Sequence, residues 1–331
     1  MLQVLRKIAF PISLIYALVV YVRNFLFDIG VFKSKSFSTP TICVGNISVG
    51  GTGKTPMTEF LLRMLKDKKV AVLSRGYKRQ SKGFVLANEG SSVLDLGDEP
   101  FQIHKKFPDV AIAVDGDRPN GIAQLENGVK PEVIVLDDAM QHRWVKPTKT
   151  ILLTAYSKLY VNDWYLPTGD LRDAKVASKR ADVIVVTKCP ASISEAEKKN
   201  IAIKLKPESN QKVLFASLAY ADFVSDGNQN KPLSELINKS FALVTGIASP
   251  EPLVQYLSAM GLEFEHFEFG DHHHFTDEEI GTFSGFDQIL TTEKDFVRLE
   301  GRVDGVFYLE VAHQFNATDT AALEESLKQI F

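Results

Sequence analysis

A glycine-rich loop between a predicted strand and a predicted helix constrains the fold of this 331-residue chain more than any other feature. The run Thr41-Ile42-Cys43-Val44 is typical of a buried strand, and a helical pattern begins after Gly50-Gly51-Thr52-Gly53-Lys54-Thr55. In this context, backbone N–H groups converge on phosphate oxygens at the positive end of a helix. The sequence therefore predicts a P-loop that binds the phosphates of a nucleoside triphosphate.

Each residue of the loop has an expected role. Lys54 is expected to neutralise the β- and γ-phosphates, and the Thr55 hydroxyl to bind Mg²⁺. One position departs from the usual pattern, because Ser48 stands where the first glycine is expected. The predicted phosphate-binding residues are Ser48, Val49, Gly50, Gly51, Thr52, Gly53, Lys54 and Thr55.

An acidic pair supplies the second part of the predicted nucleotide site. Asp137 and Asp138 directly follow the apolar run Val133-Ile134-Val135-Leu136, so they end a predicted strand. The carboxyl ends of parallel strands face the same crevice, and a carboxylate there can hold Mg²⁺ directly or through water. The run Thr187-Lys188-Cys189-Pro190 lacks the aspartate of a guanine-specific motif, which favours ATP over GTP.

Strands and helices alternate from residue 41 onward, which predicts a mostly parallel sheet covered by helices on both faces. Strands are expected at residues 41–44, 70–73, 110–114, 133–136, 151–154, 183–187 and 213–217. Helices are expected at residues 55–65, 99–106, 119–126, 171–181 and 195–205. Cys43 and Cys189 lie in or next to apolar runs, so we expect two buried thiols.

The polar, turn-rich residues 226–232 interrupt the alternation of predicted strands and helices. Beyond them, strands are expected at residues 241–245, 264–269, 288–291 and 306–309, with helices at 250–260, 277–283, 293–299 and 318–330. These elements predict a smaller C-terminal α/β domain. The predicted division is an N-terminal helical segment at residues 1–35, a nucleotide-binding domain at 36–220 and the C-terminal domain at 221–331.

The N-terminal segment predicts contact with a membrane surface. Residues 8–22 carry no charge, and they lie between basic residues, among them Arg6 and Arg23. An interfacial helix uses such basic flanks together with aromatic side chains. The alternatives are a helix packed on the protein's own core and a true span, which needs roughly 20 apolar residues. The net charge of −3 gives the whole molecule no attraction for nucleic acid.

Several ordered motifs resemble the tetraacyldisaccharide 4′-kinase family, the lipid A kinases. They are residues 44–56, Ser74-Arg75-Gly76-Tyr77, Gly97-Asp98-Glu99-Pro100, Asp117-Arg118, residues 137–142, residues 166–172, Asp271-His272-His273 and Thr292-Glu293-Lys294-Asp295. The resemblance implies ATP- and Mg²⁺-dependent phosphorylation of the 4′-hydroxyl of a tetraacylated glucosamine disaccharide 1-phosphate, a membrane lipid. The product would resemble lipid IVA, made at the cytoplasmic face of the bacterial inner membrane.

The resemblance also implies roles for single residues. Asp98 would be the base that accepts the proton of the sugar hydroxyl, with His272 beside it; an ordinary helix cap is the alternative for Asp98. The residues expected to contact substrate or phosphate are Arg75, Arg118, Gln141, His142 and Arg172. Asp173 stands where the family carries glutamate, which leaves its role open. A membrane-tethered nucleotide switch that acts by partner binding is the alternative function.

Overall fold

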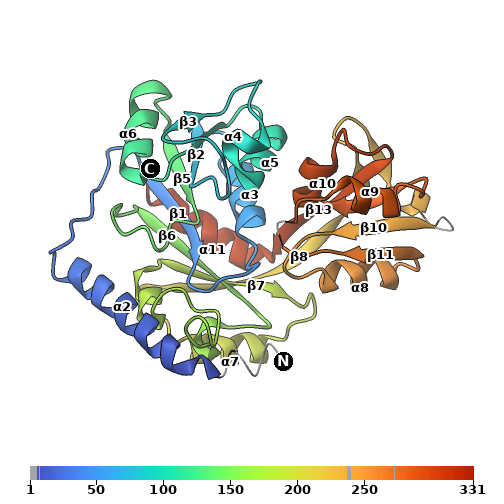
Figure 1. The fold of residues 1–331 in the computed structure, drawn as a ribbon. Coiled ribbons are helices and arrows are strands. Elements are labelled where there is room, and N and C mark those ends of the chain that lie inside the picture. The colour runs from blue at the N-terminus through green and yellow to red at the C-terminus, as the bar shows by residue number, and fades with distance from the viewer. Residues whose placement is uncertain (1–5, 7, 237–239, 272) are drawn as a thin grey trace.

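The computed structural model describes residues 6, 8–236, 240–271 and 273–331. Among these, one sheet of thirteen strands runs through the molecule in the order β11-β10-β12-β13-β8-β7-β6-β1-β5-β2-β4-β3, with β9 paired to β8 (Figure 1). The strands are β1 (Thr41–Asn46), β2 (Val70–Ser74), β3 (Val85–Leu86), β4 (Ala111–Val114), β5 (Val133–Asp137), β6 (Lys149–Ala155), β7 (Val183–Cys189), β8 (Lys212–Ser225), β9 (Asn230–Pro232), β10 (Phe241–Thr245), β11 (Phe264–Glu268), β12 (Ile289–Thr292) and β13 (Val306–Phe315).

Helices cover both faces of the nucleotide-binding half of this sheet, as predicted. The described α-helices are α2 (Phe10–Asp28), α3 (Lys54–Met64), α4 (Val93–Leu96), α5 (Asp98–Lys106), α6 (Arg118–Gly128), α7 (Glu195–Leu205), α8 (Glu251–Ala259), α9 (Asp277–Phe283), α10 (Glu293–Leu299) and α11 (Ala317–Lys328). Within β1, Ile42 packs into the core that contains α3, and Cys43 packs into the core that contains α6. Strands β8, β7, β6, β1, β5, β2 and β4 are parallel neighbours, so the predicted α/β class is confirmed.

Two long antiparallel strands join the halves of the molecule. Strands β8 and β13 pair along most of their lengths, and β13 continues the sheet to β12, β10 and β11. The chain then returns, because Leu323 and Leu327 of α11 pack into the core of the nucleotide-binding half. The proposed boundary between residues 220 and 221 falls inside β8, and the division into domains stays a prediction.

The α-helix expected at residues 171–181 is wrong. Leu171 instead forms β-bridges with Ser48 and Tyr165, and a 3₁₀ helix occupies Lys175–Arg180. Asp173 accepts a hydrogen bond from the backbone of Ala174 at 2.8 Å, which holds the turn between the two. Residues 170–172 pair with residues 47–49, directly before the glycine loop. This long-range pairing overrides the helical pattern of the segment. By contrast, the two cysteines are buried free thiols, as expected.

Helix α2 lies across the outside of the molecule, on the opposite side from α8, α9 and α10 (Figure 1). It is the one described helix that is long and apolar enough to cross a membrane. Its inner face buries Ser13, Val20, Asn24 and Phe27. Its outer face exposes apolar side chains that include Ile12, Leu14, Ile15, Leu18, Val19 and Tyr21. The polar side chains Ser13 and Asn24 of α2 therefore face the protein, whereas the exposed outer face of the helix is apolar.

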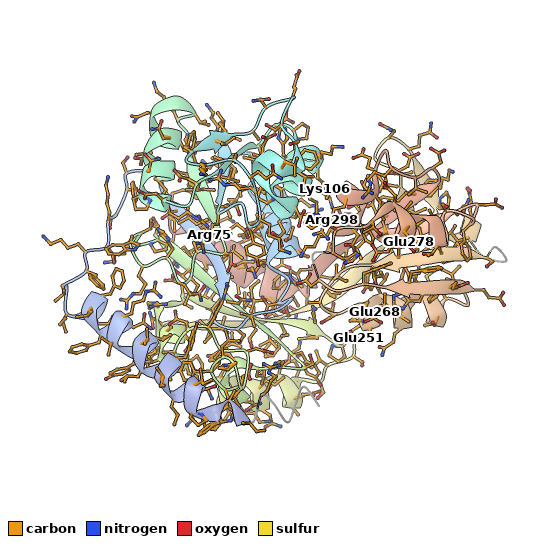
Figure 2. The ribbon with its side chains drawn as sticks, viewed as in Figure 1. Arg75, Lys106, Glu251, Glu268, Glu278 and Arg298 are labelled. Atoms are coloured by element: carbon orange, nitrogen blue, oxygen red, sulfur yellow. The ribbon has the colours of Figure 1, made fainter. Side chains whose placement is uncertain are left out.

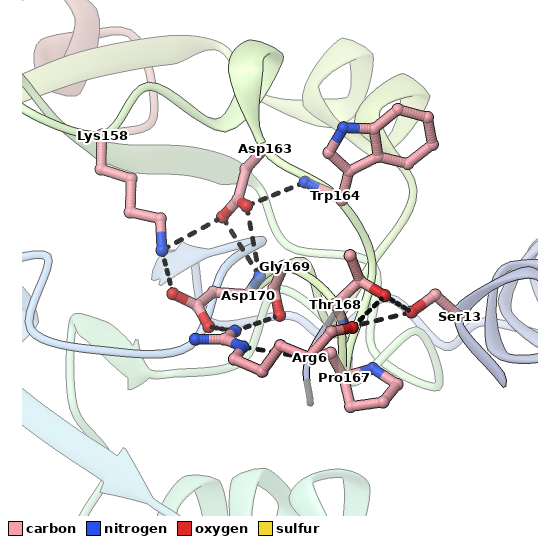
Figure 3. A network of polar contacts seen from close by, with 9 residues as sticks. All are labelled: Arg6, Ser13, Lys158, Asp163, Trp164, Pro167, Thr168, Gly169 and Asp170. Carbon is pink, nitrogen blue, oxygen red and sulfur yellow. Dashed lines mark hydrogen bonds and ion pairs between the residues drawn. The ribbon is translucent and has the colours of Figure 1, made fainter. Parts of the chain in front are cut away.

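Polar contacts hold the start of α2 against the loop at residues 163–170 (Figure 3). The Ser13 hydroxyl donates to Thr168 Oγ1 at 2.8 Å and accepts from the Thr168 backbone at 3.0 Å. Arg6 donates to the Pro167 and Gly169 carbonyls and pairs with Asp170. Further along, Asn24 donates to Asp173 at 2.7 Å. These bonds fix the helix without using its apolar outer face.

An ionic cluster lies where α5 meets the second half of the molecule. Lys106 of α5 (Figure 2) contacts three carboxylates: Glu293 of α10 at 2.6 Å, Glu310 of β13 at 2.8 Å and Glu59 of α3 at 2.9 Å. Three carboxylates therefore share one ammonium group. Burial and the neighbouring Glu59 raise the pKa of Glu293 to about 8, so the cluster retains a proton at neutral pH.

We predict that Glu293→Gln becomes more stable than the parent protein as the pH rises from 5 to 8. Because the folded-state pKa of Glu293 lies above its unfolded value, the parent loses stability through this window, by at most about 1.4 kcal/mol per pH unit. Glutamine mimics the protonated form and does not titrate. Thermal unfolding at several pH values measures the difference, with the exposed Glu278→Gln as control. A difference that shrinks as the pH rises would contradict the shared proton.

Candidate active site

The turn from β1 into α3 forms the predicted phosphate loop. Strand β1 ends at Asn46 and α3 begins at Lys54. Gly53 caps the helix with φ 83°, and Gly50 has φ 99°, so both occupy the left-handed region that favours glycine. The Asn46 side-chain amide donates to Thr52 Oγ1 at 2.6 Å, which ties the end of the strand to the loop. The loop therefore has the strand-to-helix context that its motif predicts.

The loop opens into a cleft with a volume of about 970 Å³. Residues of α2, the phosphate loop, the ends of β2 and β5, and the second half of the molecule all line it. The predicted site residues that line it are Val49, Gly50, Gly51, Thr52, Gly53, Lys54, Thr55, Arg75, Arg118, Asp137, Asp138, Gln141, His142 and Arg172. Ser48 is buried and does not line the cleft. Asp98 does not line it either, but Glu99 and Gln102 of the same helix do. His272 lies outside the described residues.

The acidic pair differs in environment. Asp138 has φ 48°, contacts Lys54 Nζ at 3.8 Å and forms a bidentate pair with Arg172, and these cations lower its pKa despite burial. Asp137 accepts from the Ser74 hydroxyl at 3.2 Å, while its Oδ1 is buried with no hydrogen-bond partner among the described residues. Burial and the adjacent Asp138 raise the pKa of Asp137 to about 6. Asp137 is thus the carboxylate with an oxygen directed at no protein donor.

The predicted base, Asp98, is the first residue of α5 and is buried. Its carboxylate pairs with Arg298 of α10, and Arg298 also donates to Asp295 Oδ1 at 3.3 Å and to the His273 carbonyl at 3.1 Å. Lys106 of α5 and Arg298 of α10 both lie where these two helices face each other (Figure 2). No local sequence pattern marks Arg298 as a site residue, because only the fold brings α5 and α10 together.

The predicted substrate-contacting side chains differ in how far they are already bonded within the protein. Arg172 is already bonded to Asp138 and to the Asn46 side chain, so it links the acidic pair to the end of β1, where the phosphate loop begins. Arg118 is buried and donates to the Asp115 and Asp137 carbonyls; burial lowers its pKa to about 10. The exposed Arg75 faces the same cleft (Figure 2). Burial and Arg118 lower the pKa of His142 to about 4, so its ring is neutral at neutral pH.

Tyr16, Arg23 and Lys188 are among the cleft-lining residues that were not predicted as site residues. Tyr16 and Arg23 of α2 line the cleft, where the Tyr16 hydroxyl donates to the Arg172 carbonyl at 3.1 Å and Arg23 donates to the Gln141 carbonyl. Lys188, the next-to-last residue of β7, lines the cleft beside Gly51, with its pKa lowered by burial. A signal existed only for Arg23, as a lone charge within an apolar run.

Asp173 takes no part in lining the cleft. It is fully buried, pairs with Arg180 at 2.9 Å and accepts from Asn24 of α2 at 2.7 Å. These contacts assign it to the attachment of α2, rather than to the nucleotide site.

A glycine loop before a helix, an acidic strand end beside it and a parallel sheet around both define a P-loop nucleotide-binding enzyme. A family model described as Tetraacyldisaccharide-1-P 4′-kinase matches residues 5–331, and the chain belongs to this family.

Individual relatives agree with this family. A Flavobacterium johnsoniae protein named Tetraacyldisaccharide 4′-kinase is 48% identical over 321 residues, covering 95% of this chain and 94% of the relative. A Bacteroides thetaiotaomicron protein of the same name is 46% identical over 316 residues, covering 89% and 83%. A crystal structure of LpxK from Aquifex aeolicus in complex with ATP matches with a TM-score of 0.82 and 30% identity, covering 99% of each chain.

We predict that Asp173→Ala lowers the melting temperature and leaves ATP affinity unchanged. Removing the buried carboxylate leaves Arg180 and Asn24 without their partner, at a cost of about 3 kcal/mol. Thermal unfolding and calorimetric ATP titration measure the two effects, and Asp173→Asn, which keeps an acceptor oxygen, should be milder. A stable Asp173→Ala protein that loses Mg²⁺-dependent ATP binding would instead give Asp173 a role at the metal.

Proposed function

We propose that this chain transfers the γ-phosphate of ATP to the 4′-hydroxyl of a tetraacyldisaccharide 1-phosphate, giving a bis-phosphorylated lipid. The observation that carries the proposal is the single cleft onto which the phosphate loop, the Asp137–Asp138 pair and the residues beside Asp98 all open, in a chain of this kinase family. A nucleotide switch is not favoured, because the relatives are named as kinases and no guanine-specific aspartate follows Lys188.

The ATP phosphates would lie along residues 49–55, where the loop amides and the start of α3 face the cleft. Lys54 would contact the β- and γ-phosphates. The Asp137 Oδ1, which accepts no hydrogen bond from the described residues, and the Thr55 hydroxyl suit an oxygen-preferring cation such as Mg²⁺, which would neutralise phosphate charge. Asp138 has both oxygens engaged by Arg172, so Asp137 is the better candidate for the cation.

Asp98 would accept the proton of the attacking sugar hydroxyl. Its pairing with Arg298 fixes the direction of the carboxylate, and a positioned base of this kind contributes about 10²–10⁴-fold to a rate. The family resemblance pairs Asp98 with His272. Asp98 lies where α5 meets α10, so the second half of the molecule would complete the site.

The 1-phosphate of the acceptor would lie against Arg75 and Arg118, whose guanidinium groups suit an anionic headgroup. Gln141 and the neutral His142 would add hydrogen bonds to the sugar. The exposed apolar face of α2, with Trp164 also exposed beside Phe10, would rest in the cytoplasmic leaflet of the bacterial inner membrane. Acyl chains could then remain in the bilayer while the headgroup enters the cleft.

We predict that Lys54→Ala and Asp98→Asn each lower product formation by at least about 100-fold. Lys54→Ala removes the charge beside the transferred phosphate, and Asp98→Asn removes the proton acceptor while keeping the side-chain size. Mass spectrometry of the phosphorylated lipid, with ATP and the acceptor supplied in detergent micelles, measures the product. Melting temperatures show whether each variant folds. An active Asp98→Asn enzyme would remove the assignment of the base.

We predict that Leu18→Lys lowers binding to zwitterionic vesicles, which do not attract the added lysine, by about tenfold, since a leucine side chain leaving the interface forfeits roughly 1.5 kcal/mol or more. Vesicle sedimentation measures the bound fraction. Leu94→Lys, at an equally exposed leucine of α4, is the matched control, because Leu18 and Leu94 are 61% and 53% exposed. Equal losses for the two variants would show that added charge, rather than the face of α2, decides binding.

A further inference from the structure

Two side chains from outside the phosphate loop bind consecutive carbonyl groups of that loop. Thr187, at the end of β7, donates its hydroxyl to the Thr52 carbonyl at 2.9 Å, with the Thr154 carbonyl farther away at 3.3 Å. His313, near the end of β13, places Nε2 at 2.9 Å from the Gly53 carbonyl. The two donors come from strands that lie 135 and 260 residues along the chain from their acceptors.

These two bonds fix the orientation of two peptide units. In a trans peptide the C=O and N–H groups point in opposite directions, and the described cis bond lies elsewhere, at Leu166-Pro167. The Thr52 carbonyl shares its peptide unit with the Gly53 N–H, and the Gly53 carbonyl shares its unit with the Lys54 N–H. Holding both carbonyls toward β7 and β13 therefore directs both N–H groups the other way, to the side where phosphates bind.

The surroundings of His313 suit a fixed donor. The side chain is 3% exposed, and burial lowers its pKa to about 4, so the ring is neutral. Its Nδ1 has no hydrogen-bond partner within the part of the chain that the structure describes. A neutral ring that carries its hydrogen on Nε2 donates to the Gly53 carbonyl. Contact is close, since a Cβ added to Gly53 would lie 2.7 Å from Nε2.

We propose that Thr187 and His313 are positioning residues that aim the Gly53 and Lys54 amides at the nucleotide phosphates. The inference rests on the proposed phosphate-binding role of the loop. Without Thr187, the Thr52–Gly53 peptide unit could rotate, because Gly53 tolerates many backbone conformations. The Gly53–Lys54 unit is held by His313 together with the Met57 N–H, which donates to the same Gly53 carbonyl at 3.1 Å. Preorganised amides bind an anion more tightly than amides that must reorient when the anion arrives.

The test separates aiming of the amides from ordinary core stability. Thr187→Val and His313→Leu remove the donors at similar volume, whereas Thr187→Ser and His313→Gln keep one. Thr291→Val is the matched control, because Thr291 is equally buried and donates to the Val244 carbonyl at 2.7 Å in the second half. Calorimetry measures ATP affinity, thermal unfolding measures stability, and steady-state kinetics measures the KM for the lipid acceptor at saturating ATP.

We expect Thr187→Val and His313→Leu each to weaken ATP binding by about tenfold, the usual worth of one buried hydrogen bond. Thr187→Ser and His313→Gln should stay within about threefold of the parent. Thr291→Val should lower the melting temperature by a similar amount without changing ATP affinity, and the acceptor KM should stay constant. If His313→Leu does not fold, Thr187→Val and His313→Gln carry the comparison.

Unchanged ATP affinity in Thr187→Val and His313→Leu would overturn the proposal. So would a loss that Thr291→Val reproduces at equal loss of stability. Lys54→Ala distinguishes the two levels of inference: if it too binds ATP as well as the parent, the proposed phosphate site itself fails. If only Lys54→Ala loses affinity, the site stands and the positioning role does not.

Discussion

The parallel pairing of β1 between β5 and β6 is the constraint on which the rest of the site depends. Its register sets Val44 beside Asp137 and Asn46 beside Leu153, so the phosphate loop and the acidic strand end leave the sheet at one edge. Nothing in the loop itself creates that proximity. Buried strands on both sides and helices on both faces make the edge rigid, which lets backbone amides and carboxylates act as preorganised groups.

The second half of the molecule contributes to this edge through two long strands. Strands β8 and β13 carry the sheet across to β12, while His313 of β13 contacts the phosphate loop directly. Arg298 and Glu293 of α10 then reach Asp98 and Lys106 of α5. A displacement of this half would therefore change contacts at the phosphate loop and at Asp98 together. Strand β13 contacts the loop, and α10, which packs on β13, contacts Asp98.

Helix α2 combines two surfaces on one element. Its polar inner residues bond to the loop at residues 163–173, and Tyr16 and Arg23 reach the cleft, while the outer residues are apolar and exposed. A kinase acting on a lipid headgroup needs its catalytic groups within reach of the membrane plane. In the proposed orientation, the helix that carries Tyr16 and Arg23 into the cleft would also rest on the bilayer, which would meet that need with no additional element.

Local patterns allowed much of the site to be predicted. Lys54 and Thr55 follow a glycine loop, and Asp137 ends an apolar run, so short-range sequence suffices to recognise them. The helix expected at residues 171–181 failed because Leu171 pairs with Ser48, a contact across more than one hundred residues that no local pattern encodes. Arg298, Lys188 and His313 were missed for the same reason, since each acquires its role from a neighbour distant in sequence.

The sequence by itself determined the class of site: a phosphate loop, a candidate cation ligand, an apolar N-terminal helix and an alternating α/β order. Those features arise from periodicity and from residue chemistry within short windows. Only the tertiary structure decided which carboxylate keeps an oxygen without a hydrogen-bond donor, that Asp173 anchors α2, and that side chains of β7 and β13 hold the loop carbonyls. Burial and hydrogen-bond partners depend on which distant segments meet, and that is a property of the packed fold.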